Sequence, residues 1–167
     1  MQLAISRPEL LKSCVLMGAL PEAADEDVIK KMDAFVDNAK ARGMKDSAEA
    51  FTQTWFGSTF KATRDPIQAT RRERWVREIS KLKADEVEAI RQIFHRKDLT
   101  KDLGRIRCEL LVIAGDEDSP ASLESYQKLV KAVPGAEFKL IHHAGYALVI
   151  EQPEAVSYTH LTLPTKA

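Results

Sequence analysis

Three short apolar runs along the chain have the pattern of buried β-strands. They are residues 13–20 (SCVLMGAL), 108–115 (CELLVIAG) and 137–145 (EFKLIHHAG). The first two are almost continuously apolar, as expected for parallel strands that helices cover on both faces. Each run has a glycine at or near its end, where a strand gives way to a loop. We therefore predict three short buried strands.

The stretch between the second and third runs predicts one helix. Ser119 is a candidate N-cap with Pro120 at the first helical position, and Pro134 and Gly135 end the pattern. The apolar stripe consists of Leu123, Tyr126, Leu129 and Val130. A strand, a helix and a strand joined by short loops form a βαβ unit, so we expect a parallel sheet.

Residues 21–102 show helical periodicity and no convincing strand. Four amphipathic helices are predicted, at residues 25–43, 46–56, 65–82 and 84–94. Asp46 and Glu49 have the spacing of a capping box, and Asp65 followed by Pro66 is typical of a helix start. A helical insertion of this length between strands usually covers a binding site, which predicts a lid.

Composition narrows the class of protein. The 167 residues suit a single domain, and 25 basic residues balance 25 acidic ones, so nothing favours a nucleic-acid or anionic-membrane partner. No apolar run reaches the ~18 residues that a transmembrane helix needs, and the first residues lack the pattern of a secretory signal. Cys14 and Cys108 are expected to be reduced, buried thiols, which favours a cytoplasmic location.

The order of these segments resembles the C-terminal two-thirds of an α/β-hydrolase. The resemblance is carried by ISRPELLKSCVLMGAL, then LGRIRCELLVIAGDEDSP, then VPGAEFKLIHHAGYALVIEQPEAV. The insertion is most similar to the lid of the 3-oxoadipate enol-lactonase-like branch. The resemblance implies an α/β fold with about three parallel strands flanked by helices and an inserted four-helix lid. It divides the chain into residues 1–20 (core helix end and strand), 21–102 (lid), 103–156 (strand, helix, strand) and 157–167.

Such hydrolases use a serine nucleophile, an acid and a histidine in that chain order. The resemblance places the acid at Asp118, three residues after Gly115, although Asp118 also precedes a predicted helix and is a candidate for its cap. The histidine is expected directly after Gly145, where this chain has Tyr146. A phenol with a pKa near ~10 is a poor base for serine at neutral pH, and it has no second ring nitrogen for the acid to orient.

The other histidines offer weak substitutes for this base. Strand alternation predicts that His142 and His143 point to opposite faces, so that at most one leans towards the site. His95 and His160 have no supporting context, and no pair of histidines has metal-ligand spacing with a carboxylate nearby. We expect neither a metal nor a cofactor.

The two ends of the chain also depart from the hydrolase pattern. No Gly-x-Ser-x-Gly occurs, and the nearest fragment is FGSTF at residues 56–60. The resemblance therefore implies that the sequence begins inside the helix that follows the nucleophile. The final segment, SYTHLTLPTKA (residues 157–167), has no helical period and is expected to be non-native and to form no helix.

Two functional hypotheses follow. In the first, the chain is a fragment of a serine hydrolase that acts on a small-molecule ester, lactone or similar acyl substrate, and it is inactive as given. Four aromatic side chains are candidates for lining its acyl pocket or, alternatively, for packing the lid: Trp55, Phe56, Phe60 and Trp75. In the second, the hydrolase scaffold serves as a non-catalytic binding protein, or as a lyase or isomerase that needs no triad. An unpaired sheet edge and an uncovered apolar face of residues 1–10 also predict low stability for this chain alone.

Overall fold

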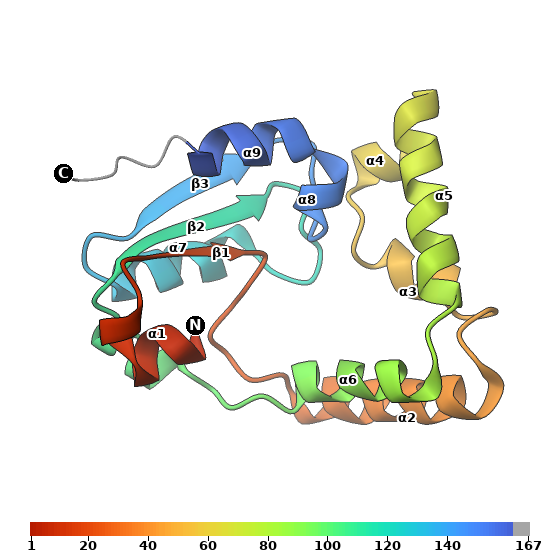
Figure 1. Cartoon of the computed structure of the whole chain (residues 1–167), viewed down its shortest axis with the longest axis horizontal. Helices are drawn as coiled ribbons and strands as arrows, with labels where there is room; N and C mark the ends of the chain where they lie inside the picture. The colour runs from red at the N-terminus through yellow and green to blue at the C-terminus, as the bar shows by residue number, and fades with distance from the viewer. Residues whose placement is uncertain (162–167) are drawn as a thin grey trace. The chain divides into compact units, whose positions relative to one another are not determined.

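The computed structural model describes residues 1–161 and contains the predicted parallel sheet (Figure 1). Strands β1 (Ser13–Met17), β2 (Glu109–Gly115) and β3 (Glu137–Ile141) lie in the order β1-β2-β3 and are parallel. The fold class is thus confirmed as α/β, with the first and third strands shorter than predicted. β1 stops where Gly18 takes a left-handed φ of 61°, and β3 stops before a turn at His142 and His143.

The central strand β2 is buried on both faces, which explains why its sequence is apolar after Glu109. Residues 110–114 are each at most 3% exposed. Leu111 and Ile113 pack against Leu148 and Val156 on one face of the sheet. Alternation along the strand turns Leu110, Val112 and Ala114 to the other face, and α7 also packs on β2. Because both faces are covered, no position from 110 to 114 accommodates a polar side chain without burial of that group.

The helices next to the sheet lie on both of its faces (Figure 1). α7 (Leu123–Ala132) covers one face, and α8 (Leu148–Glu151) and α9 (Pro153–Leu161) lie on the other. Before β1 the chain forms only two short pieces, α1 (Gln2–Ser6) and η1 (Pro8–Leu10), and before β2 it forms η2 (Thr100–Arg105). In the segment before β1, Leu3 is 50% and Leu10 58% exposed, whereas Ala4 and Ile5 are buried.

Two sequence-based expectations about helix ends are wrong. α7 begins three residues later than predicted, because Ser122 and not Ser119 is its N-cap: the Ser122 hydroxyl accepts a hydrogen bond from the N–H of Ser125 at 3.2 Å. α9 runs through Leu161, so residues 157–161 of the supposedly non-helical tail continue a helix that Pro153 opens and the buried Val156 anchors. Residues 162–167 lie outside the described part of the chain.

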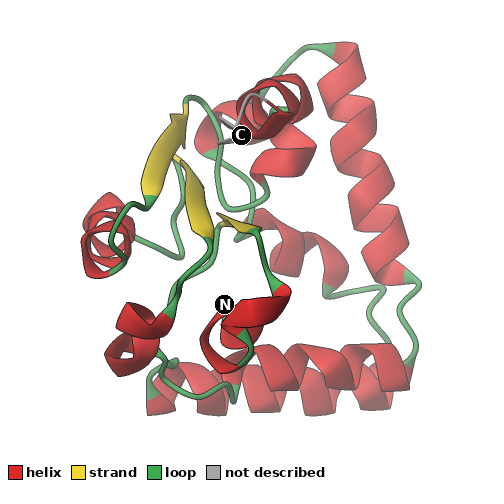
Figure 2. Ribbon diagram, turned by 60° about the vertical axis from the view of Figure 1, so that its left-hand side comes forward, coloured by secondary structure: helices red, strands yellow, loops and turns green. Residues whose placement is uncertain are grey.

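The chain divides into two compact units. The sheet unit comprises Met1–Pro21, Trp55–Thr63 and the residues from Thr100 onward, and the helical unit comprises Glu22–Thr54 and Arg64–Leu99. The segment Trp55–Thr63, which falls within the expected lid, therefore packs with the sheet and forms α4 (Ser58–Ala62) there. In Figure 2 the strands of the sheet unit are yellow and the helices of both units are red.

The helical unit consists of α2 (Glu26–Arg42), α3 (Ala48–Gln53), α5 (Pro66–Ser80) and α6 (Ala84–Phe94). Asp65 caps α5 as predicted, since its carboxylate accepts from the N–H of Ile67 at 2.7 Å. The capping box expected from Asp46 and Glu49 is absent from the described structure, where α3 instead follows Ser47. With α4 included, the insertion holds five described α-helices rather than four.

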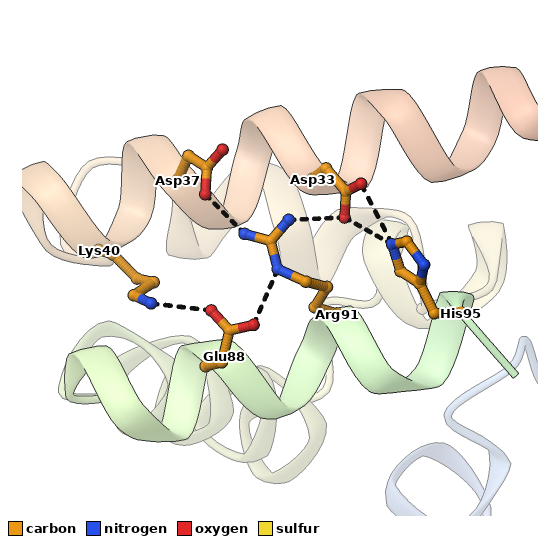
Figure 3. Close-up of polar contacts among 6 residues, drawn as sticks. All are labelled: Asp33, Asp37, Lys40, Glu88, Arg91 and His95. Atoms are coloured by element: carbon orange, nitrogen blue, oxygen red, sulfur yellow. Dashed lines mark hydrogen bonds and ion pairs between the residues drawn. The ribbon is translucent and has the colours of Figure 1, made fainter.

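An ion-pair network joins α2 to α6 (Figure 3). Its centre is Arg91 of α6, whose guanidinium lies 2.7 Å from Asp33 and 2.6 Å from Asp37, both on α2. The members are Asp33, Asp37, Lys40, Glu88, Arg91 and His95. The hydrogen bond from His95, together with Arg91, holds the pKa of Asp33 below its usual value. Val36 of α2 and Val87 of α6 are both fully buried.

Two further features bear on the class of protein. Within the described residues, no helix has both the length and the apolar character that crossing a membrane requires. Cys14 and Cys108 are free, as expected, but they are half-buried rather than fully buried. Burial and the neighbouring Cys14 raise the pKa of the Cys108 thiol, which keeps that thiol protonated.

Replacing Leu111 by alanine tests the burial of β2. We expect Leu111→Ala to lower the free energy of unfolding by about 2–5 kcal/mol, because a fully buried leucine leaves a cavity. The matched change Leu10→Ala removes the same atoms from a side chain that is 58% exposed and should cost less than about 0.5 kcal/mol. Urea denaturation measures both, and equal losses would contradict this packing.

Replacing Arg91 by glutamine tests the network on α2 and α6. We expect Arg91→Gln to lower the melting temperature at low salt, and the deficit to shrink as NaCl screens the same charges in the wild type. Arg96→Gln is the control, because the guanidinium of Arg96 donates to the backbone carbonyl of Ile93. A deficit that does not depend on salt would show that packing, not charge, holds this helix pair.

Candidate functional site

Three consecutive carboxylates follow β2, and each has a different partner. Asp116 accepts from the N–H of His143 at 2.8 Å and lies 2.9 Å from Nδ1 of His142. Glu117 accepts from the Ser58 hydroxyl at 2.9 Å and from a backbone N–H at the start of α4. Burial alone would raise the pKa of both carboxyls, but these hydrogen bonds outweigh it and lower the pKa. The first two carboxylates therefore hold neighbouring loops in place.

The third carboxylate, Asp118, turns towards α7. Its Oδ2 accepts a hydrogen bond from the hydroxyl of Tyr126 at 2.5 Å. Its Oδ1 is buried and has no hydrogen-bond partner among the described residues. Burial raises the pKa of Asp118, against the opposing effects of the Tyr126 hydroxyl and the backbone N–H of Ala121. Burial and Asp118 together raise the pKa of Tyr126, so this phenol stays protonated and donates.

Tyr146 lies in the loop between β3 and α8, at the same edge of the sheet. Its ring packs directly on the backbone of Gly18 after β1, where a Cβ atom would lie 3.0 Å from two ring carbons. Its ring centroid is 6.3 Å from that of Trp55, and its side chain is 39% exposed. Tyr146 is close enough to Tyr126 to contribute to the raised pKa of Tyr126. The carboxyl ends of all three strands thus meet around Tyr146.

A buried carboxylate fixes the backbone on both sides of this loop. Glu151 is 1% exposed, and its Oε2 accepts from the N–H of Gly57 and the N–H of Gly145, each at 3.0 Å. The N–H of Ala147 also donates to the carbonyl of Trp55 at 3.0 Å. Only glycine fits at 145, because a Cβ there would lie 2.4 Å from the nitrogen of Gly57. The backbone at 145–147 is therefore clamped against residues 55–57.

The two histidines after β3 do not take the geometry expected of them. Both lie in a turn and not in the strand, so they do not alternate between faces of the sheet. His143 has a left-handed φ of 58°, and both side chains are exposed. They lie beside Asp116 and Glu117 rather than Asp118. Among the described residues, no three His, Cys, Asp or Glu side chains could hold a metal ion.

The aromatic candidates separate in the structure. Trp55 lies against Tyr146, whereas Phe56 and Phe60 are buried with Ala147 in a small apolar cluster. Trp75 is 41% exposed and belongs to the helical unit. Phe56 and Phe60 therefore pack on Ala147 in the loop that carries Tyr146, and Trp55 packs against both that cluster and Tyr146.

The comparisons with known proteins bear on the fold. No family model and no curated protein sequence matches this chain. Among solved structures, it resembles a thermophilic esterase from Thermogutta terrifontis with a TM-score of 0.85, 19% identity and 95% of this chain covered. It also resembles an alpha/beta hydrolase enzyme from a Medee basin deep-sea metagenome library (TM-score 0.80, 20% identity, 96% covered) and the enol-lactonase from Burkholderia xenovorans LB400 (0.76, 20%, 95%). This chain has the α/β-hydrolase fold.

The matches span only part of the hydrolases. The aligned region is 57% of the esterase chain and 58% of each of the other two. The order of strands, the helical insertion between β1 and β2 and the helix between β2 and β3 all agree with the fold inferred from the sequence. That Asp118 and Tyr146 stand at the positions of the acid and the histidine stays a prediction from the sequence resemblance.

Two residues of the site were not singled out from the sequence. Tyr126 fits the apolar stripe of its helix, and only its hydroxyl, which a buried tyrosine must satisfy, signals another role. Glu151 is a charged residue in the sequence EQP, and nothing in its spacing shows that it is buried. Both are defined by contacts with segments distant in the chain.

The buried carboxyl of Glu151 predicts a pH dependence of stability. Burial raises its folded-state pKa above 4.5, against the opposing hydrogen bonds from Gly145 and Gly57. The folded state then holds the proton to higher pH than the unfolded state, so this group's contribution to stability falls as pH rises from about 4.5 through the folded pKa. Glu151→Gln keeps an acceptor oxygen and removes the titration. We expect its free energy of unfolding to decline less over this range than that of the wild type.

Urea titrations at several pH values between about 4 and 8 measure this difference in slope. Glu154→Gln is the matched control, because Glu154 is exposed on α9 and should keep the wild-type slope. An unchanged slope in Glu151→Gln would show that Glu151 titrates as it does in the unfolded chain.

Proposed function

We propose that this chain derives from an α/β-hydrolase-type serine hydrolase acting on a small-molecule ester, lactone or similar acyl bond. We further propose that the chain as given performs no triad hydrolysis. The observation that carries the proposal is the arrangement of Asp118 after β2 and Tyr146 after β3 at one edge of the sheet. The esterase and the enol-lactonase with similar structures support the substrate class.

The chemistry of the two positions supports the loss of activity. A serine hydroxyl attacks an acyl carbon only when a base removes its proton, and a carboxylate must orient that base. A phenol, with a usual pKa near ~10, is a poor base for this proton transfer at neutral pH. The carboxylate of Asp118, which would orient a base, instead accepts a hydrogen bond from Tyr126. The sequence also contains no Gly-x-Ser-x-Gly to supply the nucleophile.

A second candidate function is ligand binding without catalysis. Tyr146 favours it, because its side chain is partly exposed between Gly18 and Trp55 and a phenol hydroxyl can donate to a ligand carbonyl. A lyase or isomerase without a triad would use the same donor.

A cytoplasmic location, expected from two free thiols, also stays a prediction.

Hydrolysis assays test the first proposal. We expect the purified chain to turn over p-nitrophenyl acetate, p-nitrophenyl butyrate and a small enol-lactone no faster than the heat-denatured chain. A fluorophosphonate probe, which reacts covalently with activated serines, should not label the chain. An active α/β-hydrolase esterase serves as the positive control.

Asp118→Asn separates real catalysis from background. Slow hydrolysis that persists in Asp118→Asn comes from adventitious nucleophiles and agrees with the proposal. Hydrolysis that exceeds the denatured control and disappears in Asp118→Asn would overturn it, because Asp118 would then be part of a working site.

A further inference from the structure

The contact between Tyr126 and Asp118 is built into the core of the sheet unit. Tyr126 is 1% exposed on α7, and its neighbour on the same face, Leu129, is equally buried. Its hydroxyl can meet its hydrogen-bond requirement only inside the protein, and it does so at Oδ2 of Asp118, 2.5 Å away. The helix that carries this phenol is itself held in place, since Ser122 caps α7 and α7 packs on β2.

The rest of the Asp118 carboxyl is enclosed. Oδ1 is buried without a hydrogen-bond partner in the described part of the chain, so the donors that stabilise the carboxylate are the Tyr126 hydroxyl and the backbone N–H of Ala121. A carboxylate that orients an imidazole must accept its N–H and balance the charge of its cation. A phenol that already donates to the same carboxylate stabilises the negative charge and competes for this role.

We propose that Tyr126 is a positioning residue that commits Asp118 to α7 and thereby withholds it from any base at position 146. The inference rests on the proposed function, since it takes Asp118 as the residue at the acid position. It adds that the departure from the triad involves two positions and not one. Placing a histidine at 146 alone therefore does not restore an acid–imidazole pair, whereas removing the Tyr126 hydroxyl as well does.

The pKa of an imidazole introduced at position 146 shows directly whether the carboxylate of Asp118 is available to it. An imidazole next to an available carboxylate has its pKa raised by about 1–3 units above the usual ~6.5. In Tyr146→His we expect the new imidazole to titrate within about half a unit of the usual value. In Tyr146→His/Tyr126→Phe we expect a pKa at least about one unit higher. Proton NMR titration follows the ring signal, which is identified by its absence from the parent spectrum.

Two controls define the source of the shift. Tyr146→His/Tyr158→Phe removes a hydroxyl from an exposed tyrosine and should match Tyr146→His alone. Adding Asp118→Asn to Tyr146→His/Tyr126→Phe should return the pKa to the usual range. An imidazole pKa that stays the same or falls when Tyr126→Phe is added would overturn the inference, because the phenol would then be idle or would support the pair.

The outcomes distinguish this inference from the proposed function. If Asp118→Asn lowers the pKa of the new imidazole but Tyr126→Phe does not raise it, only the role of Tyr126 fails. If Asp118→Asn has no effect either, Asp118 does not reach position 146 and the proposed function fails too.

A second measurement avoids the substitution at 146. Carbon-13 NMR titration of Asp118 should show a higher carboxyl pKa in Tyr126→Phe than in the wild type, because the hydrogen bond to the charged form is lost. An unchanged Asp118 pKa would contradict the contact itself.

Discussion

The carboxylate of Glu151 holds together two segments that are distant in the sequence. It accepts backbone N–H groups from Gly57, in the link before α4, and from Gly145, in the loop after β3. These N–H groups are buried where water cannot reach them, so without this acceptor each would remain unsatisfied at a cost of about 1–3 kcal/mol. The positions of Trp55, two residues before Gly57, and of Tyr146, directly after Gly145, follow from this bridge. The site is thus set by one buried side chain that contributes no chemistry of its own.

Burying the carboxylate of Glu151 also costs free energy of hydration, and the same cost arises at the buried carboxylate of Asp118. Both groups lose hydration, which raises their pKa, and both leave one oxygen without a hydrogen-bond partner in the described structure. Their partners differ in kind. Glu151 is satisfied by the backbone, which any sequence with glycines at 57 and 145 supplies. Asp118 is satisfied by the hydroxyl of Tyr126, a side chain that a single substitution removes.

The accuracy of sequence-based prediction follows the range of the interactions involved. β2 was predicted to the residue at its carboxyl end, because a run buried on both faces needs only its own composition to be recognised. The Asp65 cap was predicted because the carboxylate and the N–H that it accepts are two residues apart. The turn at His142 and His143 was missed, because it is held by Asp116, which follows a different strand, β2. Tyr126 and Glu151 were missed for the same reason, since their partners lie at least six residues away in the sequence.

This difference in range decides how Tyr146 is interpreted. Considered alone, a tyrosine after Gly145 is one altered residue in a hydrolase-like motif. In the structure, its ring lies on a glycine that leaves no space for a Cβ atom, and it neighbours Trp55, which the Glu151 bridge brings there. Asp118, the residue proposed at the acid position, accepts a hydrogen bond from a second tyrosine, Tyr126. The proposed coupling therefore links position 146 to position 126 through Asp118, because the hydroxyl of Tyr126 already donates to the carboxylate that an imidazole at 146 would need.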